Sequence, residues 1–368
     1  MTTITRFKQT SSTTAALALC MAASMSMSSA ANAQTATIPL TCSGVDIQIT
    51  TPGHYVGVPG NTCTTVSIAT SDVVIDGVNF QGGGTTAAAV KNSFAGLANV
   101  TVKNSTFAGY TGRTITYGFA EGAPSADIRG SNWSIIDNVI AQGGSDATAI
   151  AMFNIDEVTL SGNRVTYTGA GNGRRGFNLD SSSSVLVTGN VLNMGGSGPT
   201  CSGVSTISPW GIQISMSNAP VAKVEIIGNT ITGTFRAVQG LSQKNVTSLQ
   251  VVNNNFEACR GVDLNTGGVA PMADLVYSGI KIVANDQVTI GGGATDALAT
   301  YGVGLRDFYT TAPQASLSLS VVRAGGKVSF LDVKIHGNKV SNAAIFLRTY
   351  PTNPDVTYDV KATGNSLR

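Results

Sequence analysis

Val158-Thr-Leu-Ser-Gly-Asn163 alternates apolar and polar residues and closes on a glycine–asparagine pair, and apolar residues resume at Val165. Alternation with a period of two is typical of a β-strand that faces a core on one side. Gly162 allows the positive φ of a sharp turn. The stretch therefore predicts a strand, a tight turn and a second strand that follows almost at once.

Similar stretches occur eight times along the chain. In four of the seven intervals, the closing asparagines are 25 or 27 residues apart. A period of this length predicts a solenoid in which each repeat makes one coil, and the longer intervals are then loop insertions or skipped coils. Stacked amides about 4.8 Å apart hydrogen-bond the coils on either side. We therefore expect a structural role for Asn104, Asn138, Asn163, Asn190, Asn229, Asn254, Asn338 and Asn365.

A third strand follows each turn, as at Gly176-Phe-Asn-Leu-Asp180. Three short strands in about 25 residues, with no helical stretch between them, are typical of a parallel β-helix. We predict an all-β fold, a single-stranded right-handed parallel β-helix (solenoid) of about 10–11 coils with three short strands per coil. This domain is expected to span residues 65–368, after an N-terminal segment or cap at residues 34–64.

The repeat resembles that of the pectin-lyase-like superfamily of right-handed parallel β-helix proteins, over about residues 65–368. The resemblance implies a protein that acts on polysaccharides, many of them acidic, because secreted enzymes of this kind dominate the superfamily. It also contains epimerases, tailspikes and adhesins, and one fold hosts many different sites. The pectate-lyase pattern Arg-x-Pro-x-x-Arg and the polygalacturonase motifs are absent; Arg348-Thr-Tyr-Pro351 has a different spacing.

The first 33 residues have the features of a secretory signal peptide. Arg6 and Lys8 precede an apolar stretch at residues 15–23, and Ala31-Asn-Ala33 is a small-x-small cleavage site. We expect cleavage after Ala33 and a secreted or periplasmic protein. No later apolar stretch approaches the roughly 20 residues of a membrane helix, so an integral membrane protein is not expected.

Four cysteines remain after removal of the signal peptide, and an even number in an exported protein predicts disulfides. We expect the pairs Cys42–Cys63 and Cys201–Cys259, with four buried thiols as the alternative. Charged residues make up 11% of the chain and the net charge is +2, so nucleic acid is not an expected partner. No cofactor is predicted, because the chain has no dense Asp/Glu cluster, although a Ca²⁺ bridge stays an alternative.

Stacking the third strands in register brings their leading residues into one row. Arg236 and Arg260 would lie on adjacent coils, roughly 5 Å apart. Two such cations repel unless an anion lies between them. That anion is either a substrate carboxylate held by bidentate contacts or an internal acid such as Asp263. The leading row is Arg113, Thr148, Arg175, Trp210, Arg236, Arg260 and Tyr301, and the row three positions later is Thr116, Ala151, Asn178, Gln213, Gln239, Asp263 and Gly304.

We predict a lyase that cleaves a uronic-acid polysaccharide by β-elimination on this face. A cation row can neutralise the uronate, and Tyr110 is the most available phenol for a base. Asp180 and Asp263 would lie about 14 Å apart, too far for a hydrolytic carboxylate pair. A non-catalytic adhesin or glycan-binding β-helix and a glycoside hydrolase are the alternatives. Candidate catalytic residues are Arg174, Arg175, Arg236 and Arg260; candidate substrate-binding residues are Tyr110, Arg113, Asn178, Asp180, Trp210, Gln213, Gln239 and Asp263.

Overall fold

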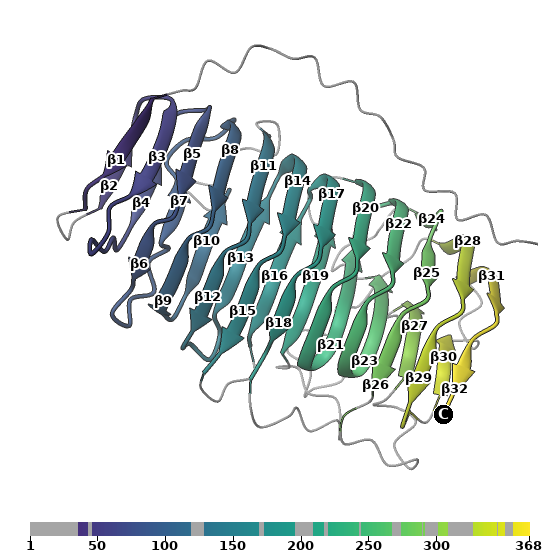
Figure 1. The fold of residues 1–368 in the computed structure, drawn as a ribbon. Helices are drawn as coiled ribbons and strands as arrows, with labels where there is room; N and C mark the ends of the chain where they lie inside the picture. Colours follow the sequence, from purple (N-terminus) through teal and green to yellow (C-terminus); the bar gives the residue numbers. More distant parts are fainter. Residues whose placement is uncertain are drawn as a thin grey trace, which may run out of the picture. The chain divides into compact units, whose positions relative to one another are not determined.

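The described part of the chain consists of β-strands joined by turns and loops, with no helix, from β1 (Thr37–Leu40) to β32 (Ser366–Leu367) in the computed structural model (Figure 1). Every pair of neighbouring strands runs parallel, as in β11–β14 and β13–β16. The structure describes residues 36–42, 46–118, 129–168, 173–195, 209–216, 220–242, 244–266, 274–288, 290, 301–307, 327–343, 345–349 and 356–368.

The strands stack into three parallel sheets, one for each side of the coil. Sheet 1 contains β1, β3 (Gly53–Gly57), β5 (Val73–Asp76), β8 (Ala98–Lys103), β11 (Gly130–Ile136), β14 (Ile155–Ser161), β17 (Ser183–Thr188), β20 (Val221–Ile227), β22 (Val246–Val252), β24 (Leu275–Ser278), β25 (Lys281–Val283), β28 (Val328–His336) and β31 (Val356–Thr363).

Sheets 2 and 3 share two long strands, β21 (Thr230–Ser242) and β23 (Asn255–Thr266), which run through the corner between them. Sheet 2 also contains β6 (Asn79–Gln81), β9 (Thr106–Tyr110), β12 (Val139–Gln142), β15 (Arg164–Tyr167), β18 (Val191–Asn193), β26 (Asp286–Val288), β29 (Lys339–Ser341) and β32. Sheet 3 also contains β2 (Ile47–Ile49), β4 (Val66–Ile68), β7 (Val90–Asn92), β10 (Arg113–Tyr117), β13 (Thr148–Phe153), β16 (Arg175–Asp180), β19 (Trp210–Met216), β27 (Tyr301–Asp307) and β30 (Ile345–Thr349).

This arrangement confirms the predicted parallel β-helix with three short strands per coil. Nine coils, from the one that begins with β5 to the one that begins with β28, contribute to all three sheets, and coils with two strands flank them. β1 and β3 lie in the segment expected as a cap, and they already pair in sheet 1.

The core between the sheets is a set of side-chain columns. In sheet 1, inward residues at the same strand position pack one above another, and none of this column is more than 2% exposed. Burying each such side chain contributes about 1.5–3 kcal/mol to stability. Trp133 occupies the same column, and its Nε1 donates to the carbonyl oxygen of Leu97 at 3.1 Å. The column is Val73, Val100, Trp133, Val158, Val185, Val224 and Leu249.

Asparagines at the turn between sheets 1 and 2 form the predicted ladder. The backbone N and the Nδ2 of Asn163 both donate to Oδ1 of Asn190, at 2.9 and 3.0 Å, and Nδ2 also donates to the carbonyl of Ile135. The same contacts repeat along the ladder, so these amides are satisfied within the fold. The ladder is Asn138, Asn163, Asn190, Asn229, Asn254, Asn285, Asn338 and Asn365.

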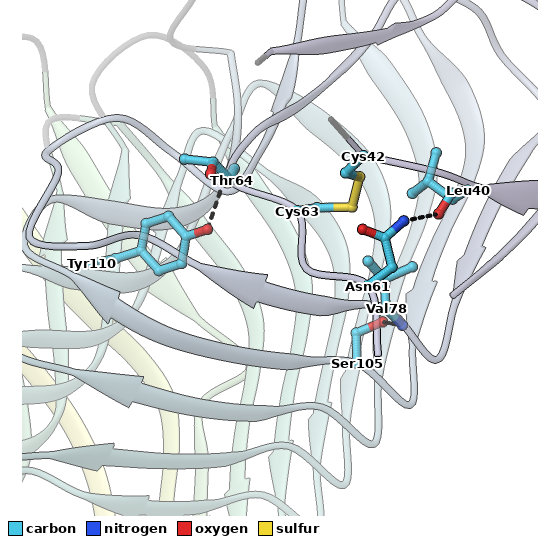
Figure 2. Close-up of a disulfide and its surroundings, with 8 residues drawn as sticks. All are labelled: Leu40, Cys42, Asn61, Cys63, Thr64, Val78, Ser105 and Tyr110. Carbon is cyan, nitrogen blue, oxygen red and sulfur yellow. Dashed lines mark hydrogen bonds between the residues drawn. A yellow bond between two sulfur atoms is a disulfide. The ribbon is translucent and has the colours of Figure 1, made fainter. Parts of the chain in front are cut away.

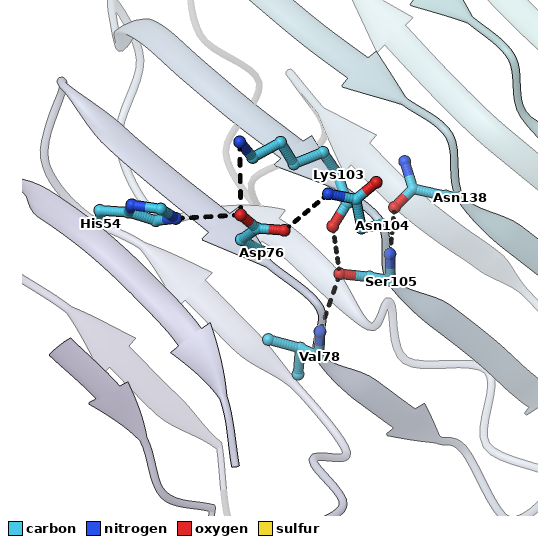
Figure 3. A network of polar contacts seen from close by, with 7 residues as sticks. All are labelled: His54, Asp76, Val78, Lys103, Asn104, Ser105 and Asn138. Carbon is cyan, nitrogen blue, oxygen red and sulfur yellow. Dashed lines mark hydrogen bonds and ion pairs between the residues drawn. The ribbon is translucent and has the colours of Figure 1, made fainter. Parts of the chain in front are cut away.

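One predicted member of the ladder is wrong, and another was missed. Ser105 holds the place expected for Asn104: its N donates to Asn138 Oδ1, and its Oγ accepts from the backbone N of Val78 (Figure 3). Asn104 lies one position earlier, at a φ of 51°, the left-handed position that glycine holds in other coils and that asparagine tolerates. Asn285 belongs to the ladder although it falls inside the longest interval between repeats.

The predicted disulfide between Cys42 and Cys63 is confirmed, and it joins β1 to the loop before β4 (Figure 2). Cys259 is also disulfide-bonded, while its predicted partner Cys201 lies outside the described residues. The predicted signal peptide, residues 1–33, lies outside them too. Among the described residues, no helix has the length and apolar character to cross a membrane.

Candidate groove on the outer face of sheet 3

The two residue rows predicted on the third strands are present in sheet 3. Arg113, Thr148 and Arg175 are register partners, and the row continues through Trp210 to Arg236. Three positions later, the partners run from Thr116 through Ala151, Asn178, Gln213 and Gln239 to Asp263. The spacing of the glycine–asparagine repeat was therefore sufficient to align the third strands.

In β21 and β23, a bend places the leading residue and the one three positions later on the same outer face. The second and third residues are both buried, as Ala237 and Val238 show, so the strand does not alternate there. At Gly176 the second position leaves no room for a side chain, because a Cβ there would lie 2.5 Å from the carbonyl oxygen of Gly211 in the next coil. Arg260 accordingly contacts Asp263, three residues later, across the bend.

The outer face is hollowed at its N-terminal end. A groove of about 790 Å³ crosses β4, β7, β10, β13 and β16. The turn at residues 86–88 and Asp146 line it at the beginning of the strands, and Asn92 and Ser93 line it at their end. Most of its remaining lining consists of outward side chains of the two rows, so the groove lies across the strands near the coils that carry Arg113 and Arg175.

Cations outnumber carboxylates in this groove. Lys91, Arg113 and Arg175 line it, and Asp146 is the one carboxylate among its described lining residues. Burial lowers the pKa of Arg175, and the neighbouring Arg113 cation lowers it further, against opposing effects of Asp146 and Tyr167. A lowered arginine pKa means that the cation is poorly stabilised where it sits. An anion bound in the groove would stabilise the Arg175 cation.

Arg175 packs on Trp210 at the C-terminal edge of the groove. Its guanidinium carbon lies 4.7 Å from the ring centroid, and it forms no ion pair with a described residue. The Nε atom of Arg175 is buried and receives no partner within the described protein, and the same holds for Nε1 of Trp210. The two side chains thus form a platform with unused hydrogen-bond donors.

The amides beside this platform also have unused atoms. Oδ1 of Asn178 and Oε1 of Gln213 and Gln239 are buried and accept no hydrogen bond from the described residues. An unmade hydrogen bond of a buried group costs about 1–3 kcal/mol. The strand register places all three of these predicted substrate-binding residues in the predicted row. Asp180 lies at the end of β16, where its Oδ1 accepts from the hydroxyl of Ser181 at 2.8 Å.

In the C-terminal half of the face, the buried carboxylate of Asp263 neutralises the two leading arginines. Oδ2 of Asp263 contacts Nε of Arg236 at 2.9 Å and Nη1 of Arg260 at 3.4 Å. The side chain of Asp263 is fully buried, and those of the two arginines are only 11% and 5% exposed. Of the two anions considered for this pair, the internal acid contacts both arginines, so Asp263 is a structural counter-ion rather than the substrate-binding residue predicted from the sequence.

Two other site predictions are corrected by burial. Tyr110 is the last residue of β9 and points into the core, where its hydroxyl donates to the carbonyl of Thr64 at 2.6 Å (Figure 2). Burial raises its pKa far above the usual value. Arg174 is 3% exposed; its Nη1 donates to the carbonyl of Met194, and its guanidinium lies over Tyr167. Neither side chain reaches the groove.

Lys91 and Asp146 were not predicted from the sequence as residues of this face. Lys91 is the register partner of Thr116, but its strand β7 has no leading arginine, so the repeat gave no reason to choose it. Its Nζ lies 3.3 Å from Asp46, with both side chains exposed. Asp146 lies in a connection between sheets 2 and 3, whose path the repeat does not specify.

No metal site is evident in the part of the chain that the structure describes. No three His, Cys, Asp or Glu side chains there lie close enough together to hold an ion. The groove itself contributes one carboxylate and three cations, a donor set unsuited to Ca²⁺, which prefers six to eight oxygen ligands.

Comparison with known proteins identifies the fold. A family model described as the right-handed β-helix region matches residues 60–256. A search of curated proteins found no match. Among solved structures, the chain is similar to the catalytic domain of a GH87 α-1,3-glucanase, with 11% identity over 90% of this chain and 63% of the other and a TM-score of 0.33. It is also similar to the A-module of the Azotobacter vinelandii mannuronan C-5 epimerase AlgE6, with 14% identity over 91% of each chain and a TM-score of 0.37. A third similar structure is the DFA-IIIase of Arthrobacter chlorophenolicus A6, with 12% identity over 88% of this chain and 82% of the other and a TM-score of 0.34.

With TM-scores below 0.5, the similarities to solved structures carry no information about the reaction. The chain spans less than two thirds of the glucanase domain.

Proposed function

The chain belongs to the right-handed β-helix family, and from the groove on sheet 3 we propose that it is a secreted carbohydrate-active protein that binds an acidic polysaccharide. One observation carries the proposal: Lys91, Arg113 and Arg175 face a groove whose described lining has Asp146 as its one carboxylate. A cleft lined by one sign of charge concentrates the opposite charge. Arginine also binds carboxylates through two parallel hydrogen bonds.

The reaction that this groove suits best is β-elimination at a uronate. Arg113 and Arg175 would neutralise the carboxylate, which acidifies the proton on C5. A base would remove that proton, the electron pair would form the C4–C5 double bond, and the C4–O bond would break as the leaving oxygen takes up a proton. Lys91 and Asp146 are the described lining groups that can exchange a proton.

Glycan binding without cleavage is the second candidate. It is favoured by the positions of Tyr110, the predicted base, and Arg174, one of the four predicted catalytic arginines, because both side chains are bonded elsewhere. Hydrolysis fits less well, since it requires two carboxylates about 5–9.5 Å apart and the described lining of the groove has one.

The test is an incubation of the purified mature protein with polyglucuronate, pectate, alginate and glycosaminoglycans. Near-ultraviolet absorbance reports the unsaturated product, and calorimetry reports binding. Rising absorbance on at least one uronate polymer is the expected result. Binding without absorbance would support the second candidate, and reducing ends without absorbance would indicate hydrolysis. Absence of both binding and cleavage on every polymer would overturn the proposal.

A further inference from the structure

Phe94 is the most exposed large hydrophobic side chain in the described part of the chain. It is 57% exposed, whereas the others, all aliphatic, are 36–49% exposed. A single exposed apolar residue is ordinary on a protein surface. Phe94 differs in its position, because it follows directly after Asn92 and Ser93, which line the groove.

The backbone of Phe94 is fixed by one of the groove residues. Asn92 is 4% exposed; its Nδ2 donates to the carbonyl of Phe94 at 2.9 Å, and its Oδ1 accepts from the backbone N of Gly118 at 2.9 Å. The amide therefore ties the turn after β7 to the end of β10. Both strands contribute to the floor of the groove.

A second contact holds the other side of the same turn. The backbone N of Gly96 donates to the hydroxyl of Tyr117 at 2.9 Å, and Tyr117 is fully buried against Trp133. The turn is thus attached to the core on both sides of Phe94, while the phenyl ring itself is left in solvent. A rigid backbone that presents an aromatic ring loses little conformational entropy when the ring binds something.

Resting on the proposed function, we propose that Phe94 is a stacking residue at the rim of the groove for one sugar ring of the bound glycan. An aromatic face packs well against a flat face of C–H groups, and a pyranose with equatorial hydroxyls offers such a face. With a carboxylate bound by Arg175 and Arg113, this selects a polymer of equatorial uronates such as glucuronate. A guluronate ring, whose two linkage oxygens and one hydroxyl are axial, would fit the phenyl face poorly.

The experiment measures binding of glucuronate and guluronate hexasaccharides by calorimetry. Phe94→Ala should weaken glucuronate binding about fivefold or more and Phe94→Trp should keep or improve it, as expected for lost or enlarged aromatic contact. Guluronate binding should be weaker from the start and change little. The thermal midpoint should stay constant in both variants, because the side chain is exposed. Leu331→Ala, on sheet 1 and 37% exposed, is the matched control.

The outcomes separate the two proposals. If Phe94→Ala binds glucuronate within about twofold of the unmodified protein, a difference too small for a lost stacking contact, while Arg175→Gln loses binding, the stacking role is overturned and the proposed function stands. If the unmodified protein binds neither hexasaccharide, the stacking role is overturned, and the proposed function is then decided by the full panel of polymers.

Discussion

Both halves of sheet 3 contain strands that begin with arginine, but the arginines have different partners in the two halves. In the C-terminal half, Arg236 and Arg260 hold the buried carboxylate of Asp263. In the N-terminal half, Arg175 lines an open groove, and Asn178 stands three positions later. Because the strand bend brings the two rows together, an acid in the later row, on the same coil as the arginine or on the next one, determines whether the charge is neutralised inside the protein or left for a ligand.

The same comparison explains why the arginine row could mislead. Row membership follows from the coil repeat, so all four arginines look equivalent in sequence. Asp263 distinguishes the C-terminal pair because it accepts from both neighbours. An acid in this row is therefore the signal of an ion pair within the fold.

The largest expected effect is loss of stability in the closed half. Asp263→Asn would leave two buried cations without their counter-ion, which costs about 3–5 kcal/mol in similar buried pairs. We expect the free energy of unfolding in urea to fall by that amount. The exposed Asp286→Asn, on β26, is the control and should change it little. An unchanged midpoint for Asp263→Asn would break the distinction between the halves.

A smaller effect is expected in the open half, and on binding rather than on stability. Arg175→Gln should weaken uronate binding about tenfold to a hundredfold, the size of a lost charge-assisted hydrogen bond. Its thermal midpoint should hold or rise, since no described acid pairs with Arg175. Arg236→Gln is the matched variant, expected to lower stability and leave binding intact. The reverse pattern in the two variants would contradict the account.

The sequence predicted the repetitive part of this protein better than the site. Strand alternation and the glycine–asparagine turn depend on local chemistry, so they placed the register of Arg175 and Trp210 correctly. Asn104 was misplaced by one residue because asparagine also tolerates the left-handed turn position. Tyr110 and Arg174 were misjudged because their directions depend on corners and on packing between coils.

The groove could not be predicted for a related reason. Its walls come from connections of irregular length, such as the one that carries Asp146, and the repeat carries no information about their paths. Lys91 could not be predicted as a groove residue either, because its strand lacks the leading arginine that identified other strands of this sheet.

The most direct test moves the closed arrangement into the open half. Asn178→Asp places a carboxylate three positions after Arg175, as Asp263 stands after Arg260. We predict that calorimetry with glucuronate hexasaccharide will show binding at least about tenfold weaker, as for a lost charge-assisted contact, with a thermal midpoint that is unchanged or higher. Binding as tight as that of the unmodified protein, in a variant that folds normally, would contradict the claim that an acid in this row decides how the arginine is used.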